Sequence, residues 1–280
     1  WLVHEVLTHY LRQGSHPICG LLDCTKAFDL AKWDKMFSQI LLRKVPAIVA
    51  RAMIYTYQEQ YAWCRWGKEK SEIFPIVNGT RQGSMASPFL WAVYCDPLLA
   101  RLRVLGVGCH VGGMWMGAQL YCDDVAFLAP NRRAMELMLR EAEAWAAEFN
   151  VTFSTDPDPQ KSKCKLIFMC GHNSKLAKPA TIFLCGRALP WVASATHLGH
   201  EIHESGDMNH DAKIKRAQYI GKSVEVRETF SFASPPEVLT ALDKYCTSYY
   251  GCLAGWDLSS DAAKSFFSAQ TVAVKLAWGV

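Results

Sequence analysis

Apolar residues at the start of the chain recur every three or four positions, which is the spacing of one face of an amphipathic helix. They are Leu2, Val3, Val6, Leu7, Tyr10 and Leu11. Gly14 and Pro17 then interrupt the pattern, and the apolar run of Ile18–Asp23 predicts a buried strand. The first residues are therefore expected to form a helix, a loop and a strand.

Helical and strand patterns alternate over the next part of the chain. Apolar spacing predicts two helices, and Pro46 separates them because proline cannot continue a helix. The polar segment Gly67–Lys70 lies between two apolar stretches and predicts the turn of a β-hairpin. The predicted elements are helices over residues 33–41 and 47–58, hairpin strands over 61–66 and 73–77, and a helix over 84–103 with Pro88 in its first turn.

A second hairpin is predicted around a pair of acidic residues. The apolar stretches Ala118–Tyr121 and Val125–Leu128 flank Cys122, Asp123 and Asp124, so the two acids would lie at the hairpin's tip. A helix with Asn131 as its N-terminal cap is expected to follow. Its apolar stripe consists of Met135, Met138, Leu139, Ala142, Trp145, Ala146 and Phe149.

The last part of the chain changes from short strands to helices. Residues 151–202 show strand and loop patterns, whereas the pattern from Asp207 onward is helical. Ser234–Glu237 has the residues of a capping box, and Ser260 is suited to cap a last helix. This order predicts an α+β fold, an antiparallel sheet with helices on one face, over residues 1–206, and a separate helical subdomain over residues 207–280.

Composition and charge narrow the class of protein. Half of the residues are apolar, which allows a sizeable core, and the net charge of +4 permits nucleic-acid binding without requiring it. The eleven cysteines are odd in number and form no C-x-x-C pair, which favours reduced thiols in an intracellular protein, in either the nucleus or the cytoplasm. Charged residues interrupt every long apolar run, so no membrane span is expected.

Three aspartates lie where a sheet would present them as metal ligands. Asp23 ends a predicted strand, and Asp123 and Asp124 lie at the predicted hairpin tip. Carboxylates at strand ends suit Mg²⁺, and two such ions about 3.5–4 Å apart stabilise the attacking and leaving oxygens of a phosphoryl transfer. Because an Asp pair is also common in ordinary turns, the acids alone leave both interpretations open.

Five short motifs occur in order between residues 20 and 200. They are Leu22–Asp29 (LDCTKAFD), Gly79–Pro88 (GTRQGSMASP), Tyr121–Asp124 (YCDD), Lys161–Lys163 (KSK) and His197–Gly199 (HLG). Together they resemble the motifs of reverse transcriptases from LINE-type (non-LTR) retrotransposons, in the order of that family. The resemblance implies a polymerase palm with partial fingers over residues 1–206, followed by a helical thumb-like region over residues 207–280.

The resemblance implies that the three aspartates bind two metal ions. Asp23 and Asp123 would hold both Mg²⁺ ions, or Mn²⁺ in their place, and Asp124 would be a looser third contact. Phe28 would lie under the incoming sugar, where a bulky ring excludes a 2′-hydroxyl and so selects deoxynucleotides.

The same resemblance implies further contacts to the nucleotide. Cys24, Gln82 and Gly83 would bind the nucleotide or the nascent base pair, with glycine allowing close backbone approach. Lys161 would protonate the departing pyrophosphate. Lys161, Lys163 and Lys165 alternate, however, and for the last two a solvated strand edge is the favoured interpretation.

Contacts to the primer and to the duplex are implied further along the chain. His197, Leu198 and Gly199 would form the primer grip, with His197 in place of the family's usual aromatic residue. The basic residues of the first thumb helix would contact duplex phosphates. They are Lys213, Lys215, Arg216 and Lys222. Asp211, Glu225 and Glu228 interrupt them, so a solvated face is the alternative.

These expectations describe an RNA-directed DNA polymerase that adds deoxynucleotides to the 3′ end of a primer. Its partners would be an RNA template, a DNA or RNA primer and deoxynucleoside triphosphates. One alternative is an RNA-dependent RNA polymerase with a similar palm, against which Phe28 argues. The other is a non-catalytic nucleic-acid-binding remnant, because the family's fingers segment is expected upstream of Trp1. The sequence does not indicate an oligomeric state.

Overall fold

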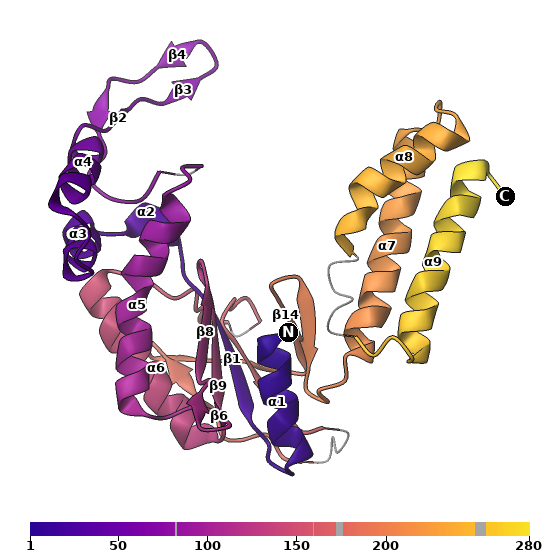
Figure 1. Cartoon of the computed structure of the whole chain (residues 1–280), viewed down its shortest axis with the longest axis horizontal. Coiled ribbons are helices and arrows are strands. Elements are labelled where there is room, and N and C mark those ends of the chain that lie inside the picture. The colour runs from indigo at the N-terminus through magenta and orange to yellow at the C-terminus, as the bar shows by residue number, and fades with distance from the viewer. Residues whose placement is uncertain (82, 159, 172–175, 250–255) are drawn as a thin grey trace. The chain divides into compact units, whose positions relative to one another are not determined.

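A computed structural model describes residues 1–81, 83–158, 160–171, 176–249 and 256–280 (Figure 1). The chain forms two compact units. Unit 1 contains Trp1–Pro17, Ile167–Lys178 and Trp191–Val280, and unit 2 contains Ile18–Leu166 and Pro179–Pro190. The boundary near residue 207, which the sequence predicts between the α+β region and the helical subdomain, stays a prediction.

Unit 2 is built on a sheet whose strands come from distant parts of the sequence. β9 lies between β1 and β8, to which it pairs antiparallel, and β10 flanks β1 on its other side. The register places Asp23 opposite Asp124, so the two acidic motifs meet at one end of the sheet. The strands are β1 (Ile18–Asp23), β8 (Ala118–Tyr121), β9 (Asp124–Ala129) and β10 (Lys165–Phe168). β10 continues into unit 1, where the fifth strand of the sheet, β13 (Trp191–Val192), flanks it.

Helices α5 (Ser87–Leu105) and α6 (Arg132–Phe149) lie on the same side of this sheet (Figure 1). The predicted apolar stripe of α6 is buried, and its predicted cap is confirmed, since the Asn131 side chain accepts a hydrogen bond from the Ala134 N–H. The helix approaches β1 so closely that a Cβ atom at Gly20 would lie 3.1 Å from Met135. A glycine in β1 therefore allows α6 to pack against the strand that ends in Asp23.

The remaining elements of unit 2 are short. The predicted 61–77 hairpin forms, but its turn is shorter than predicted. Trp66 pairs with Glu69, so the turn contains only Gly67 and Lys68, and the positive φ of Gly67 (59°) permits this. The helices are α2 (Ala27–Leu30), α3 (Trp33–Leu42) and α4 (Ala47–Gln58), and the strands are β2 (Tyr61–Ala62), β3 (Arg65–Trp66), β4 (Glu69–Lys70), β5 (Phe74–Pro75), β6 (His110–Val111), β7 (Met114–Trp115), β11 (Phe183–Leu184) and β12 (Arg187–Ala188).

Unit 1 combines a hairpin with a helical region that has its own core. The capping box of Ser234 with Glu237 and the Ser260 cap, which accepts from the Ala263 N–H, are both confirmed. Tyr219, Val238 and Phe266 are buried where α7, α8 and α9 pack together. The elements are α1 (Leu2–Arg12), β13 (Trp191–Val192), β14 (Ser194–His197), β15 (His200–His203), α7 (Asn209–Thr229), α8 (Pro235–Cys246) and α9 (Asp261–Trp278).

The observed fold class is α+β, as the sequence predicts. None of the helices in the described ranges has the length and hydropathy that a bilayer-spanning segment needs.

Candidate active site

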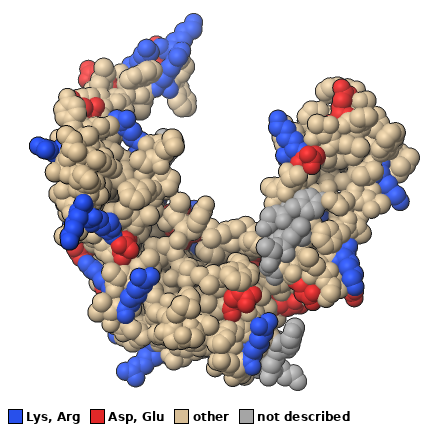
Figure 2. All heavy atoms as spheres, in the orientation of Figure 1, with Lys and Arg blue, Asp and Glu red and all other residues tan. Residues whose placement is uncertain are grey.

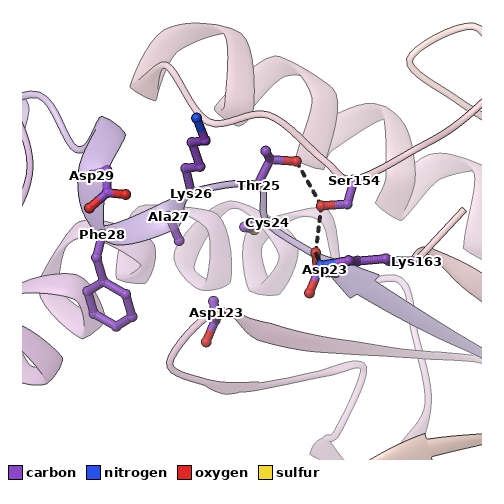
Figure 3. Close-up of a pocket in the computed structure, with 10 residues that line it drawn as sticks. All are labelled: Asp23, Cys24, Thr25, Lys26, Ala27, Phe28, Asp29, Asp123, Ser154 and Lys163. Carbon is purple, nitrogen blue, oxygen red and sulfur yellow. Dashed lines mark hydrogen bonds and ion pairs between the residues drawn. The ribbon is translucent and has the colours of Figure 1, made fainter. Parts of the chain in front are cut away.

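Asp23 lies where β1 leaves the core, directly after five buried residues. The Ser154 hydroxyl donates a hydrogen bond to Asp23 Oδ2 (2.5 Å), and the Thr25 hydroxyl lies 2.7 Å from Ser154 Oγ (Figure 3). Since the Ser154 proton goes to the carboxylate, Thr25 donates to Ser154. The Lys163 ammonium lies 3.7 Å from the same Oδ2. A chain of two hydroxyls and one cation therefore fixes the orientation of this carboxylate.

Backbone pairing beyond the end of β1 brings Ser154 to this place. The Thr25 N–H donates to the Thr152 carbonyl (2.7 Å), and the Ser154 N–H donates to the Asp23 carbonyl (2.8 Å). Between them, Cys24 and Phe153 form an antiparallel bridge. Ser154 is not predictable from the sequence, because no local pattern marks a contact between residues 131 positions apart.

An open cavity of about 300 Å³ lies beside this carboxylate. It combines three carboxylates, an aromatic ring and two lysines, which is a suitable lining for a nucleotide with its phosphates and their metal ions. Its walls are formed by Asp23, Cys24, Thr25, Lys26, Ala27, Phe28, Asp29, Asp123, Ser154 and Lys163 (Figure 3).

The second acidic motif reaches the cavity through a tight turn. Tyr121 pairs with Asp124, so Cys122 and Asp123 alone form the loop between β8 and β9. Cys122 has a positive φ of 52°, as two-residue hairpin turns require, and its carbonyl accepts a hydrogen bond from Trp91 Nε1 (2.8 Å). The turn is therefore fixed to α5, with Asp123 on the cavity wall and Asp124 in β9 opposite Asp23.

The acids present suit a divalent cation that takes further ligands from its substrate. Within the described ranges, no three His, Cys, Asp or Glu side chains converge closely enough to enclose a metal ion by themselves. Asp23 and Asp123 both line the cavity, and Mg²⁺ is commonly bound by one or two carboxylates together with water and substrate phosphates. The donor chemistry thus fits a divalent cation that is bound together with a phosphate-bearing substrate.

The second sequence motif contacts the first through its glycine. The Gly79 N–H donates to the Ala31 carbonyl (2.8 Å), and the Thr80 N–H donates to the Phe28 carbonyl (2.6 Å). A Cβ atom on Gly79 would lie 2.8 Å from the Asp29 carbonyl oxygen, and its φ is 86°. Only glycine fits there. The Phe28 ring packs against Trp91 with ring centroids 5.6 Å apart.

The structure describes two of the three other residues that are expected to contact the nucleotide. Cys24 lines the cavity but is largely buried, and this burial raises the pKa of its thiol well above the ordinary value. The thiol is therefore neutral at physiological pH. Gly83 is exposed with a φ of 79°. Gln82 lies outside the described residues.

The lysines of the fourth motif occupy different environments. Lys161 is highly exposed, and its ammonium lies 3.9 Å from Asp158. Lys163 lines the cavity beside Asp23. The Lys163 side chain is 71% exposed, as a solvated residue would be, but it lies outside the strands and its ammonium faces Asp23. The Lys163 N–H donates to the Ser154 carbonyl (3.1 Å), which holds this residue close to the carboxylate. The role expected for Lys161 stays a prediction.

The expected primer grip forms the turn of the β14–β15 hairpin. His197 pairs with His200, and the turn residues Leu198 and Gly199 have φ values of 49° and 79°. Two consecutive positive values are typical of a type I′ turn. Leu198 is exposed at this tip.

The basic residues expected to bind duplex phosphates lie on α7. Lys213 is exposed, Lys215 lies 3.4 Å from Gln218, and Lys222 forms an ion pair with Glu225 (2.7 Å). Arg216 instead donates to the Ser265 carbonyl of α9 (3.0 Å), which is a packing contact.

Asp211, at the start of α7, does not belong to a solvated face. Its side chain is fully buried, so that alternative interpretation was wrong for this residue. Its carboxylate accepts hydrogen bonds within unit 1, which a solvated acid would not need.

The chain belongs to the reverse transcriptase (RNA-dependent DNA polymerase) family, whose pattern matches residues 3–202. Its curated relatives are proteins of retrotransposable elements. A Pol polyprotein of the type-1 element R2 of Nasonia vitripennis is 27% identical over 186 residues, which is 64% of this chain and 18% of that protein. A putative 115 kDa protein of the type-1 element R1DM of Drosophila melanogaster is 30% identical over 136 residues, or 46% of this chain and 12% of that protein. The chain thus spans less than a fifth of the length of these relatives.

Two solved telomerase structures align with the chain at low scores. Apo telomerase from Candida tropicalis has a TM-score of 0.49 at 10% identity, covering 73% of this chain and 39% of that chain. Telomerase from Candida albicans, in complex with a fragment of telomeric RNA, has a TM-score of 0.46 at 9% identity, covering 97% and 52%. Scores at this level do not by themselves establish a shared fold.

Proposed function

We propose that this chain is the nucleotidyl-transfer module of a retroelement reverse transcriptase, which extends a primer on an RNA template with deoxynucleotides. One observation carries the proposal. In a member of the reverse transcriptase family, Asp23 and Asp123 come from separate motifs and line the same open cavity.

The two acids are the proposed ligands of two Mg²⁺ ions, with Mn²⁺ as a substitute. The bound ions would neutralise charge on the attacking and leaving oxygens of the phosphoryl transfer. The protein's own part is positioning. Ser154 and Lys163 orient Asp23, the Trp91 contact fixes the turn that carries Asp123, and Asp124 adds negative charge at the same end of the sheet.

Phe28 is the proposed sugar gate. Its ring lines the cavity and packs against Trp91, and its carbonyl is fixed by the Thr80 N–H. A ring held in this way excludes a 2′-hydroxyl because it cannot move aside without breaking these contacts. Cys24, Gln82 and Gly83 remain the proposed contacts to the nucleotide.

Two lysines are placed to act on the phosphates. Lys26 and Lys163 both line the cavity, so they would offset the charge of the triphosphate. Lys163, rather than Lys161, is the residue proposed to protonate the pyrophosphate. The ammonium of Lys161 is near Asp158, whereas that of Lys163 is beside Asp23. The Lys163 ammonium would give one proton to the leaving oxygen and become a neutral amine, which water would then reprotonate.

The remaining roles belong to the primer and the duplex. The turn His197–Gly199 is the proposed primer grip, and Lys213, Lys215 and Lys222 are the proposed phosphate contacts of a thumb formed by residues 207–280. Arg216 has a weaker case for this role, because its guanidinium already donates to α9.

The test is primer extension by the purified chain. An RNA template with a DNA primer and Mg²⁺ is offered deoxynucleotides or ribonucleotides. Extension by deoxynucleotides that is lost in Asp123→Ala but kept in Asp243→Ala, an exposed acid on α8, would support the proposal. Extension by ribonucleotides alone would overturn it in favour of an RNA-dependent RNA polymerase. RNA binding without any extension would instead indicate a non-catalytic remnant.

The sugar gate is tested in the same assay. Phe28→Ala should incorporate ribonucleotides that the unchanged chain rejects, whereas Phe28→Tyr, which keeps the ring, should reject them. Unchanged discrimination in Phe28→Ala would remove Phe28 from this role.

A further inference from the structure

The hairpin formed by β2 to β5 carries large aromatic side chains in open solvent. Trp66 is 89% exposed, Tyr61 61% and Trp63 48%. Lysine and arginine side chains gather at the far end of the same hairpin (Figure 2). Exposed aromatic rings are costly to leave in water, so their presence on one element points to a binding surface.

The strand register separates two faces of this hairpin. Arg65 pairs with Lys70, and Trp66 pairs with Glu69. Paired residues share a face of an antiparallel ladder and neighbours along a strand alternate, so Arg65 and Lys70 lie on one face and Trp66 and Glu69 on the other. Trp63, two residues before Arg65, belongs with the cations.

Contacts confirm this grouping. The Lys70 ammonium lies 4.7 Å from the centroid of the Trp63 ring. Arg65 Nε donates to the Gly67 carbonyl at 3.0 Å, which holds the guanidinium over the turn. We call Trp63, Arg65 and Lys70 the Trp63 face.

We propose that the Trp63 face binds a single-stranded segment of nucleic acid, with a base stacked on Trp63 and phosphates contacted by Arg65 and Lys70. Aromatic rings next to cations are the combination that proteins use for single strands, because every base offers a π-face and every link a negative charge. By the same alternation Glu72, two residues after Lys70, lies on the Trp63 face, where two cations outnumber it. The paired residues of the opposite face are an aromatic ring and Glu69, which repels phosphate. The charge difference between the faces thus favours nucleic acid on one of them.

A duplex is a poorer occupant of this face. The bases of a duplex are stacked on one another, so they are not available to Trp63. The phosphates of a duplex are also held at a fixed spacing along its grooves. The inference goes beyond the proposed function, because binding by the hairpin requires neither the carboxylates nor nucleotide transfer.

The experiment measures binding of a fluorescein-labelled single-stranded RNA oligonucleotide to the chain by anisotropy, without Mg²⁺ or nucleotides. Trp63→Ala should weaken binding about tenfold, the effect of losing one stacked base. The double variant Arg65→Gln/Lys70→Gln should lower the slope of log K against log salt by about 1.4, since each phosphate contact to a single strand contributes about 0.7.

Matched controls lie on the other face of the same hairpin. Trp66→Ala removes an equally large and more exposed ring, and Glu69→Gln removes a charge, yet both should bind within about twofold of the unchanged chain. Unlabelled RNA duplex should compete less well than the single strand. Circular dichroism of each variant checks that the chain remains folded.

Two results would overturn the proposal. Equal losses in Trp63→Ala and Trp66→Ala would show that the faces are not distinct. Unchanged affinity and salt slope in the Trp63-face variants would show that nucleic acid does not bind there, and a protein partner would become the better explanation. Neither result would bear on the primer-extension test.

Discussion

Two aspartates, Asp23 in unit 2 and Asp211 in unit 1, are both held by hydrogen bonds but differ in how their oxygens are used. Asp211 is fully buried. Its Oδ1 accepts from the Glu201 N–H (2.9 Å), and its Oδ2 accepts from Trp256 Nε1 (2.8 Å) with His200 Nδ1 at 3.5 Å. Both oxygens are therefore committed to contacts inside unit 1, where they join the β14–β15 hairpin to the helical region.

The side-chain contacts of Asp23 with the described residues lie at one of its two carboxylate oxygens. Ser154 and Lys163 both approach Oδ2, and the side chain is 30% exposed beside the cavity. A carboxylate that is oriented by neighbours yet open to an adjacent cavity retains the capacity to bind a cation. The comparison shows that the use of the oxygens, rather than the residue type, separates a structural aspartate from a candidate catalytic one.

The largest expected effect is on activity at Asp23. Asp23→Asn should lower the rate of primer extension about 10³-fold, because a metal contact contributes several kcal/mol to charge stabilisation in the transition state. Its free energy of unfolding should change by less than about 0.5 kcal/mol, since the side chain is partly exposed and Asn still accepts from Ser154. Extension assays and thermal unfolding measure the two quantities, and a near-normal extension rate would contradict the assignment.

Asp211 should show the opposite pattern. Asp211→Ala leaves the Glu201 N–H and the Trp256 indole N–H buried without an acceptor, so the helical region should lose about 3 kcal/mol of stability. Hydrogen exchange of residues 209–229 and 261–278 measures this loss. Glu228→Ala, an exposed acid on the same helix, serves as the control. If protection in Asp211→Ala matched that control, the buried network would not stabilise unit 1.

A smaller effect is expected at Ser154, which touches the carboxylate rather than the substrate. Ser154→Ala should raise the Mg²⁺ concentration for half-maximal extension about tenfold, because partners of a metal ligand typically contribute 10–100-fold. Ser154→Thr keeps the hydroxyl and should stay near the original value. An unchanged Mg²⁺ titration in Ser154→Ala would mean that Asp23 is oriented without this contact.

The smallest effect is a pH dependence of unit 1. Burial alone would raise the pKa of Asp211, but hydrogen bonds from His200, the Glu201 N–H and Trp256 hold it below its ordinary value of 3.8. A carboxyl group with a lower pKa in the folded chain stabilises it above the ordinary pKa, and this contribution is lost as the pH falls through the folded value. The protection of the α7 amides, measured against the intrinsic exchange rate at each pH, should therefore fall below about pH 4 in the unchanged chain, more steeply than in Asp211→Asn. Parallel pH profiles would contradict this.

Local patterns were enough to predict most of the elements. The sequence predicted the Asn131 and Ser234 caps, the apolar stripe of α6 and the β-hairpin around Asp123. Each of these features depends on residues only a few positions apart. The length of the turn in the 61–77 hairpin could not be predicted from the sequence. Glu69 and Lys70 are polar, and polar residues suit a turn as well as an exposed strand.

The candidate site was predicted in part. The motifs identified Asp23, Asp123 and Phe28, and all three line the cavity. They did not identify Ser154, and they did not place Lys163 beside Asp23. Ser154 and Lys163 both reach Asp23 because Cys24 pairs with Phe153. The hydrophobic pattern around Cys24 does not predict this contact, and neither does the pattern around Phe153.

By itself, the sequence determined the family of this protein, the order of its elements and the acids that its chemistry requires. Motifs and hydrophobic periodicity are properties of short segments, so they can be recognised without knowledge of the fold. Only the tertiary structure decided which lysine lies beside Asp23, that a serine hydroxyl orients that carboxylate, and that Asp211 is buried rather than solvated. Those facts depend on which distant segments pack together, and that is decided by burial and backbone pairing across the whole chain rather than by neighbours in sequence.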